Sequence, residues 1–185
     1  MTRLVLASKS PRRKELLSLI NVPFEIIVSE IEEHIDLNND LVKEIEKLSF
    51  QKASAVFQNN KDAVVIGSDT IVKIGNTPLG KPHSIDDAKE MLRMLSGKTH
   101  EVVTGVTILK ENVRDTFSSV AKVTFFELSE EEIEEYVNSG EPMDKAGSYA
   151  IQGLGAKFIK SIEGDYYSIV GLPIAELYHR LVQYL

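Results

Sequence analysis

Residues 8–13 read SKSPRR and gather hydroxyls and guanidiniums at the start of an expected helix. Backbone donors at a helix N-terminus bind anions, most often phosphate, and the hydroxyls of Ser8 and Ser10 add further donors. Arg12 and Arg13 add paired donors that match phosphate oxygens. The stretch therefore predicts a phosphate site, and the alternative is a capped surface helix with solvated arginines.

An aspartate lies in the segment GSDT, directly after the apolar run AVVI. Asp69 is therefore expected where a buried strand ends or kinks, and such strand ends line the ligand crevice of α/β sheets. A carboxylate in that place can bind a metal ion or act as a general base. The alternative is an aspartate that only serves a turn.

Two lysines and a group of glutamates complete the candidate residues. Lys52 falls on the apolar stripe of an expected helix, where an inward lysine needs a negative partner. Alternatively, its long side chain reaches solvent at the edge of the stripe. Lys81 lies in PLGKP and is either a cation for a ligand or an exposed loop lysine. The acidic segment EIEEHI offers Glu30, Glu32 and Glu33, either as metal ligands or as a solvated face.

The combination of these residue types points to one class of substrate. Arginines and lysines suit a polyphosphate, and carboxylates suit Mg²⁺. The sequence has neither a Walker P-loop nor a G-x-G-x-x-G motif, and its four histidines lack the spacing of a zinc site. The candidate residues therefore indicate chemistry on a nucleoside triphosphate without a P-loop.

The composition indicates a soluble globular chain. The 185 residues are 43% hydrophobic and 26% charged, with a formal net charge of −7. Such an acidic chain lacks the broad basic face that DNA or RNA binding requires, so nucleic acid is not an expected partner. The N-terminal apolar run LVLA is too short for a signal peptide, and nothing approaches a membrane span. Because cysteine is also absent, we expect a cytoplasmic protein.

Alternating strand and helix patterns must position the candidate residues. Strands are expected over residues 3–7, 24–29, 63–74 with an interruption at GSD, 99–109 and 116–128, the last two as a hairpin. Helices are expected from Pro11, over 40–58, over 84–97, from Ser129 to near Gly140 and from Pro173 to Leu185. Ser10 is the expected cap of the first, and two pairs have the spacing of a capping box, Ser84 with Asp87 and Ser129 with Glu132. Residues 75–82 predict a turn, and residues 146–173 predict short strands and tight turns. This order predicts an α/β fold with parallel crossovers and antiparallel hairpins.

Longer motifs make the chain similar to a known family. They are LASKSPRRKELL, VIGSDTIV, LGKP, LSGKTHEVVTGV and EPMDKAGSYAIQGLGAKFIKSIEGDYYSIVGLP, in this order. Over essentially its whole length the chain resembles the Maf family of nucleoside triphosphate pyrophosphatases. The resemblance implies a single Maf domain over residues 1–185, with an inosine triphosphate pyrophosphatase-like fold. In that fold a twisted mixed sheet is flanked by helices, and two lobes surround a deep cleft.

The resemblance also implies an activity and residue roles. The family hydrolyses nucleoside triphosphates to the monophosphate and pyrophosphate, with a divalent cation that is usually Mg²⁺ and alternatively Mn²⁺. Asp69 matches the proton acceptor, and Glu33 is favoured among the three glutamates as its partner at the metal. The implied catalytic residues are Asp69, Glu33, Lys52 and Lys81, and the implied substrate-binding residues are Ser8, Ser10, Arg12, Arg13, Thr70 and Gln152. Arg12, Thr70 and Gln152 match the branch that prefers dTTP and UTP.

Further expectations concern the cellular role. Members of the family are linked to arrest of cell division, to septum formation and to clearing modified nucleotides, and a homodimer is a family-level expectation. A competing function is a non-enzymatic, nucleotide-binding regulator of septum formation. Asp69 together with the cations favours catalysis, because binding alone does not require a placed base.

Overall fold

The computed structural model describes residues 2–185 and has the mixed α/β architecture that the sequence predicts. Within this range the strands form a seven-stranded sheet in the order β2-β1-β3-β5-β6-β7, with β4 paired to β3. The chain forms two compact units. Unit 1 holds the residues up to Thr70, Thr104–Ser119 and Gly171–Leu185, and unit 2 holds Ile71–Val103 and Val120–Val170.

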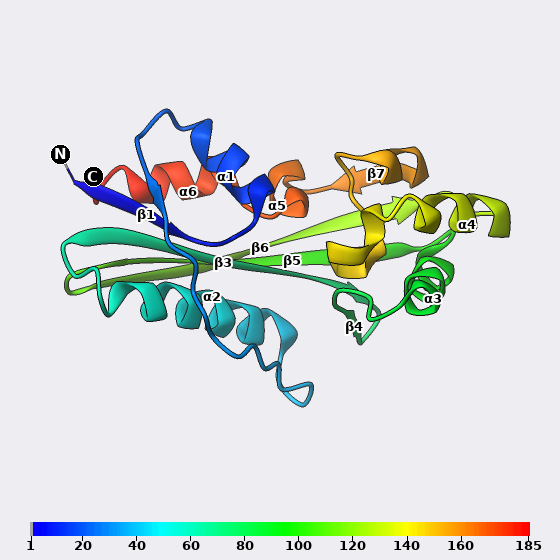
Figure 1. Ribbon diagram of the computed structural model, residues 1–185, viewed down its shortest axis with the longest axis horizontal. Helices are drawn as coiled ribbons and strands as arrows, with labels where there is room; N and C mark the ends of the chain where they lie inside the picture. The colour runs from blue at the N-terminus through cyan, green and yellow to red at the C-terminus, as the bar shows by residue number, and fades with distance from the viewer. Residues whose placement is uncertain (1) are drawn as a thin grey trace. The chain divides into compact units, whose positions relative to one another are not determined.

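The helices and strands are distributed between the units as follows (Figure 1). Unit 1 contains β1 (Arg3–Ala7), α1 (Pro11–Ser18), β2 (Glu25–Ile26), α2 (Leu41–Phe57) and α6 (Ile174–Leu181). Strands β3 (Ala63–Ile74), β5 (Thr99–Lys110) and β6 (Val113–Phe125) contribute residues to both units. Unit 2 contains β4 (Thr77–Leu79), α3 (Ile85–Leu95), α4 (Glu130–Asn138), β7 (Ile159–Glu163), α5 (Tyr166–Val170) and the 3-10 helices η1 (Glu141–Asp144), η2 (Ala146–Ser148) and η3 (Leu154–Phe158).

The centre of unit 1 is the parallel pair β1 and β3, whose register runs from Arg3 opposite Ala63 to Ala7 opposite Gly67. Residues 4–7 are all buried, as expected of a parallel strand covered on both faces. Helix α2 covers one face of this part of the sheet, and α1 and α6 cover the other (Figure 1). The expected strand 3–7 is therefore confirmed.

Helix α2 lies unusually close to the sheet. Asp40 caps it by accepting hydrogen bonds from the Val42 and Lys43 amides. A Cβ atom added at Gly67 would come within 2.3 Å of the Ser49 carbonyl oxygen, and one at Gly105 within 2.7 Å of the Ile45 carbonyl oxygen. Glycine at these two strand positions therefore sets the distance between helix and sheet.

Unit 2 has an aromatic core beneath α3 and α4. Its largest buried side chains include Phe125, Tyr136, Tyr149 and Phe158, which meet mostly edge to face. The capping box of Ser129 and Glu132 at the start of α4 is confirmed. At α3 only half of the expected box forms, because Ser84 caps the helix but the Asp87 carboxylate accepts from the His83 amide. Of the helices that the structure describes, not one combines the length and apolar character that a membrane span requires.

Outside the candidate site, three segments show the clearest differences from the sequence expectations. The strand expected over 24–29 is reduced to Glu25–Ile26, which pair with Val5 and Leu6 close to the end of β1. The expected turn 75–82 includes β4, which pairs antiparallel with β3. Residues 146–173 form one strand, two 3-10 helices and α5 rather than several strands. Left-handed backbone at Gly147 and Ser148, with φ of 68° and 62°, prevents extended structure there.

Candidate active site

The SKSPRR stretch forms the turn between β1 and α1. Ser10 is the N-cap of α1, and its hydroxyl oxygen accepts a hydrogen bond from the Arg13 amide at 3.4 Å. The buried Ser8 hydroxyl in turn accepts from the Ser10 amide at 3.2 Å. A hydroxyl that accepts in this way can still donate its own hydrogen. The turn thus presents hydroxyl donors at a helix N-terminus, with Arg12 half-buried beside them.

The parallel register places this turn beside Asp69. Because Ala7 lies opposite Gly67, β1 ends where β3 continues with residues 68–70. Strand β3 then runs without a break to Ile74, so the expectation that Asp69 lies at a strand end or kink was wrong. The strand that ends there is the neighbour β1. The carboxylate therefore still lies at the carboxyl edge of a parallel pair, where α/β proteins bind ligands.

Two carboxylates converge on one lysine at this edge. The Lys52 Nζ atom on α2 lies 2.8 Å from Asp69 Oδ1 and 2.9 Å from Glu33 Oε1. Asp69 reaches the helix because alternate strand residues share a face, and Gly67 two residues earlier also faces α2. The Lys52 side chain is 11% exposed and that of Asp69 is 14% exposed, so both charges are largely removed from water. The prediction of an inward lysine with a negative partner is confirmed.

The opposite face of β3 carries a second polar network. Arg13 Nε donates to the Gly171 carbonyl at 2.8 Å, and Arg13 Nη2 donates to Thr70 Oγ1 at 2.9 Å. Thr70 Oγ1 also lies 2.9 Å from Thr104 Oγ1, and the Ser68 hydroxyl donates to the Gly171 carbonyl at 3.2 Å. Arg13 therefore ties α1 to β3 and to the loop before α6, besides any contact with a ligand.

Burial changes the pKa of the Arg13 guanidinium. Removal from water lowers the pKa of Arg13 from its ordinary value, and the nearby Asp69 charge opposes that change. Sequence reasoning missed Ser68, Thr104 and Gly171 as members of the network. Their only local signal was a position in or beside an expected strand, which does not identify a partner.

The two remaining predicted residues, Lys81 and Gln152, belong to unit 2. Both are exposed. Their segments are tied to one another, because the Gly147 amide donates to the Gly80 carbonyl at 3.1 Å. That these two residues act on the same substrate as the residues of unit 1 stays a prediction.

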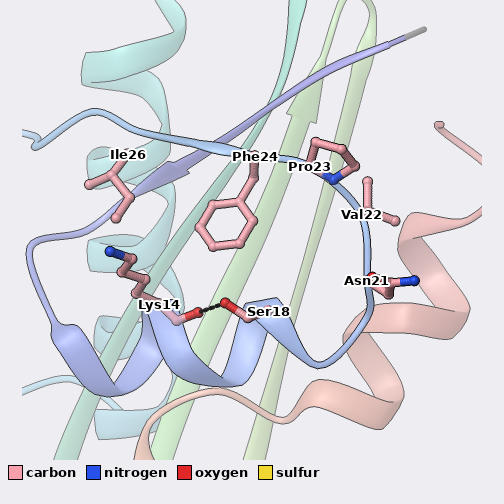
Figure 2. Close-up of a pocket in the computed structure, with 7 residues that line it drawn as sticks. All are labelled: Lys14, Ser18, Asn21, Val22, Pro23, Phe24 and Ile26. Carbon is pink, nitrogen blue, oxygen red and sulfur yellow. Dashed lines mark hydrogen bonds between the residues drawn. The ribbon is translucent and has the colours of Figure 1, made fainter.

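A separate hollow of about 550 Å³ opens on unit 1 (Figure 2). It lies between α1 and the segment that leads into β2, and is lined by Lys14, Ser18, Asn21, Val22, Pro23, Phe24 and Ile26. Ser18 donates its hydroxyl hydrogen to the Lys14 carbonyl. The lining shares no residue with the predicted site, so this hollow is not the site that the sequence predicts.

The two carboxylates at Lys52 are candidate ligands for a metal ion. In the part of the chain that the structure describes, no group of three or more histidine, cysteine or acidic side chains is arranged to hold a metal ion. Glu33 and Asp69 are nevertheless two carboxylates that already meet at one cation. Carboxylate oxygens are the ligands that hard divalent cations prefer, so the chemistry of this pair is compatible with such a cation.

Comparison with known proteins identifies the family. The family model described as Maf-like protein matches residues 3–184. The chain belongs to the Maf family. Proteins called dTTP/UTP pyrophosphatase from Bacillus cereus strains G9842 and B4264 are each 56% identical to this Maf chain over 184 residues, which is 100% of the chain and 96% of each relative. The solved structure of the Staphylococcus aureus Ham1 protein aligns with a TM-score of 0.47 and 14% identity, covering 67% of this chain and 72% of that one.

Proposed function

We propose that this chain is a nucleoside triphosphate pyrophosphatase that hydrolyses dTTP and UTP to the monophosphate and pyrophosphate. The observation that carries the proposal is the convergence of Asp69 and Glu33 on Lys52. Full-length relatives called dTTP/UTP pyrophosphatase, at 56% identity, support the choice of substrate. A non-enzymatic regulator would not need two carboxylates and a cation held together at a phosphate-binding turn.

In the proposed mechanism the β1–α1 turn binds the triphosphate. Backbone donors at the α1 N-terminus and the guanidinium of Arg12 neutralise phosphate oxygens. Asp69 accepts the proton of the attacking water, and Lys52 and Lys81 stabilise the charge that develops on the phosphates. Asp69 and Glu33 would hold a divalent cation, which when bound polarises phosphate oxygens and lowers the pKa of coordinated water.

Recognition of the base is assigned to Gln152. Uracil and thymine present an N3–H donor between carbonyl acceptors, which a side-chain amide can match with one acceptor and one donor. Cytosine reverses this pattern at N3 and at the 4-position, so an amide fixed against those two groups would meet donor with donor and acceptor with acceptor. Thr70 supports recognition indirectly in this scheme, because its hydroxyl already accepts from Arg13 and contacts Thr104.

A panel of triphosphates tests the proposal. We expect rapid release of pyrophosphate from dTTP, UTP and 5-methyl-UTP in the presence of Mg²⁺, and slow release from CTP, ATP and GTP, with products identified by mass. Each unpaired buried polar group costs about 1–3 kcal/mol, or roughly 5-fold to 150-fold in rate. Gln152→Ala should therefore narrow the difference in rate between dTTP and CTP by about that factor. A purine preference in the wild-type protein, or an equal loss on every nucleotide in the variant, would contradict the proposal.

The cytoplasmic location, the homodimer and the connection to septum formation stay predictions from the family. We propose that the cellular role is removal of modified pyrimidine triphosphates from the nucleotide pool. This role depends on acceptance of 5-substituted bases, which the panel measures directly with 5-methyl-UTP.

A further inference from the structure

The segment EPMD, which the proposed reaction does not use, supplies a carboxylate to the turn that carries Gln152. Glu141 Oε1 accepts a hydrogen bond from the Leu154 amide at 3.0 Å, and Glu141 Oε2 accepts from the Gly155 amide at 3.2 Å. These amides belong to the first residues of η3, two and three positions after Gln152. One carboxylate therefore fixes the chain directly after Gln152, with a separate oxygen on each amide.

A buried tyrosine fixes the chain before Gln152. The Tyr136 hydroxyl accepts a hydrogen bond from the Ala150 amide at 3.0 Å. Burial, together with the influence of the Glu141 carboxylate, raises the pKa of the Tyr136 hydroxyl above its ordinary value. Tyr136 thus holds the chain before Gln152, and Glu141 holds the chain after it.

The backbone between these anchors is a tight turn with no space for a side chain at its end. The Gly153 amide donates to the Ala150 carbonyl at 3.2 Å, which closes the turn around the exposed Gln152. A Cβ atom added at Gly153 would lie 1.9 Å from Glu141 Oε1. Glycine at this position therefore allows the carboxylate to approach the turn.

We propose that Glu141 is a positioning residue that fixes the Gln152 turn, so that the amide of Gln152 keeps one orientation toward the base. The proposal rests on the proposed function for the identity of the base. A fixed turn presents the Gln152 amide to the base from one place, where it meets cytosine donor to donor, whereas a loose turn lets the amide shift and accept either pyrimidine. Loss of Glu141 should therefore reduce selectivity more than it reduces turnover of the best substrate.

Amide hydrogen exchange tests the clamp without reference to activity. In Glu141→Ala, exchange of the peptide that contains Leu154 and Gly155 should quicken by about tenfold, because charge-assisted hydrogen bonds to both amides are lost. The exchange rate in Glu141→Gln should lie between those of Glu141→Ala and the wild type. The glutamine amide keeps one acceptor oxygen but turns a donor toward the second backbone N–H. Unchanged exchange in Glu141→Ala would overturn the proposal.

The ratio of kcat/KM for dTTP to that for CTP tests the effect on recognition. We expect this ratio to fall about tenfold in Glu141→Ala and less in Glu141→Gln, with kcat for dTTP changing little. Glu132→Ala is the matched control, because its carboxylate also accepts a backbone amide, that of Ser129 at 2.8 Å, in the capping box of α4. The control should lose comparable stability while keeping both the ratio and the exchange of residues 150–155.

A double variant separates the clamp from a general loss of stability. Gly153→Ala should lower the selectivity ratio as Glu141→Ala does, because the new methyl group displaces the carboxylate. The double variant should lower the selectivity ratio no further than either single variant does, because both changes remove the same interaction. The positioning role would be refuted if the two changes lowered the selectivity ratio additively, or if Glu141→Ala kept the wild-type ratio. If the wild-type protein shows no preference for dTTP over CTP, the proposed function fails, and the exchange measurement alone decides whether Glu141 holds the turn.

Discussion

Lys52 forms ion pairs with two carboxylates at once. The pair of ion contacts, 2.8 Å to Asp69 and 2.9 Å to Glu33, leaves one net negative charge in a partly buried place. Removing a single partner from such a group costs more than the contact itself contributes, because the remaining charge stays away from water. Substitutions that keep the shape of a side chain are therefore the informative ones at this site.

Asp69→Asn removes the proposed base while retaining an oxygen that can accept from Lys52. We expect turnover of dTTP to fall by roughly 10²–10⁴, the usual effect of losing a general base, with little change in the thermal midpoint. Single-turnover release of pyrophosphate measures the chemical step. Asp62→Asn removes an equal charge from an exposed partner of Arg3 and should keep wild-type activity. Wild-type turnover in Asp69→Asn would show that another group takes the proton.

At the scale of elements, the site depends on the close approach of α2 to β3. Gly67 and Asp69 lie on the same face of β3, and that face contacts the helix that carries Lys52. The distance between Asp69 and Lys52 is therefore set by glycine positions as much as by the charges.

Gly67→Ala should weaken both folding and activity. Its Cβ would come within 2.3 Å of the Ser49 carbonyl oxygen and 2.7 Å of the Ala53 amide nitrogen, which are backbone atoms that a side-chain rotation cannot relieve. We expect a loss of about 1–3 kcal/mol in the free energy of unfolding, measured by urea titration. Gly80→Ala adds a methyl group where no atom lies within 4 Å, and should leave that free energy near the wild-type value. Equal stability of both variants would contradict the packing argument.

At the scale of the whole molecule, a buried histidine makes stability depend on pH. His100 is 1% exposed, lies edge to face with Phe125 and Tyr149, and is 2.7 Å from the Tyr149 hydroxyl through Nε2. Burial lowers the pKa of His100 to about 4, against about 6.5 in an unfolded chain. The unfolded state therefore binds the proton first as pH falls, and acid favours unfolding.

We expect the contribution of His100 to be complete above about pH 6.5 and to be lost progressively down to about pH 4. The difference between these pKa values corresponds to a loss on the order of 3 kcal/mol in the free energy of unfolding. Chemical denaturation at several pH values, compared with His100→Gln, isolates this residue from the carboxylates that titrate in the same range. If the wild type and the variant lose stability in parallel below pH 6.5, the buried neutral histidine is not the cause.

The sequence by itself determined the features that depend on neighbours within about one helical turn. Ser10 as the cap of α1 and Ser129 with Glu132 as the capping box of α4 are examples, because the bonding partners are three residues apart. The inward direction of Lys52 also followed from helical periodicity alone. Local bonding and the repeat of the helix decide such features before any packing takes place.

Only the tertiary structure decided which of these side chains meet. Asp69 is 17 residues from Lys52, and Arg13 finds its partners 57 and 158 residues away, at Thr70 and Gly171. No local pattern encodes such pairings, because they arise from the register of β1 on β3 and from the depth at which α2 packs on the sheet. For the same reason the role of Glu141 could not be predicted, although its motif was visible in the sequence. Its hydrogen bonds to the Gln152 turn form only when residues 13 and 14 positions later fold back onto it.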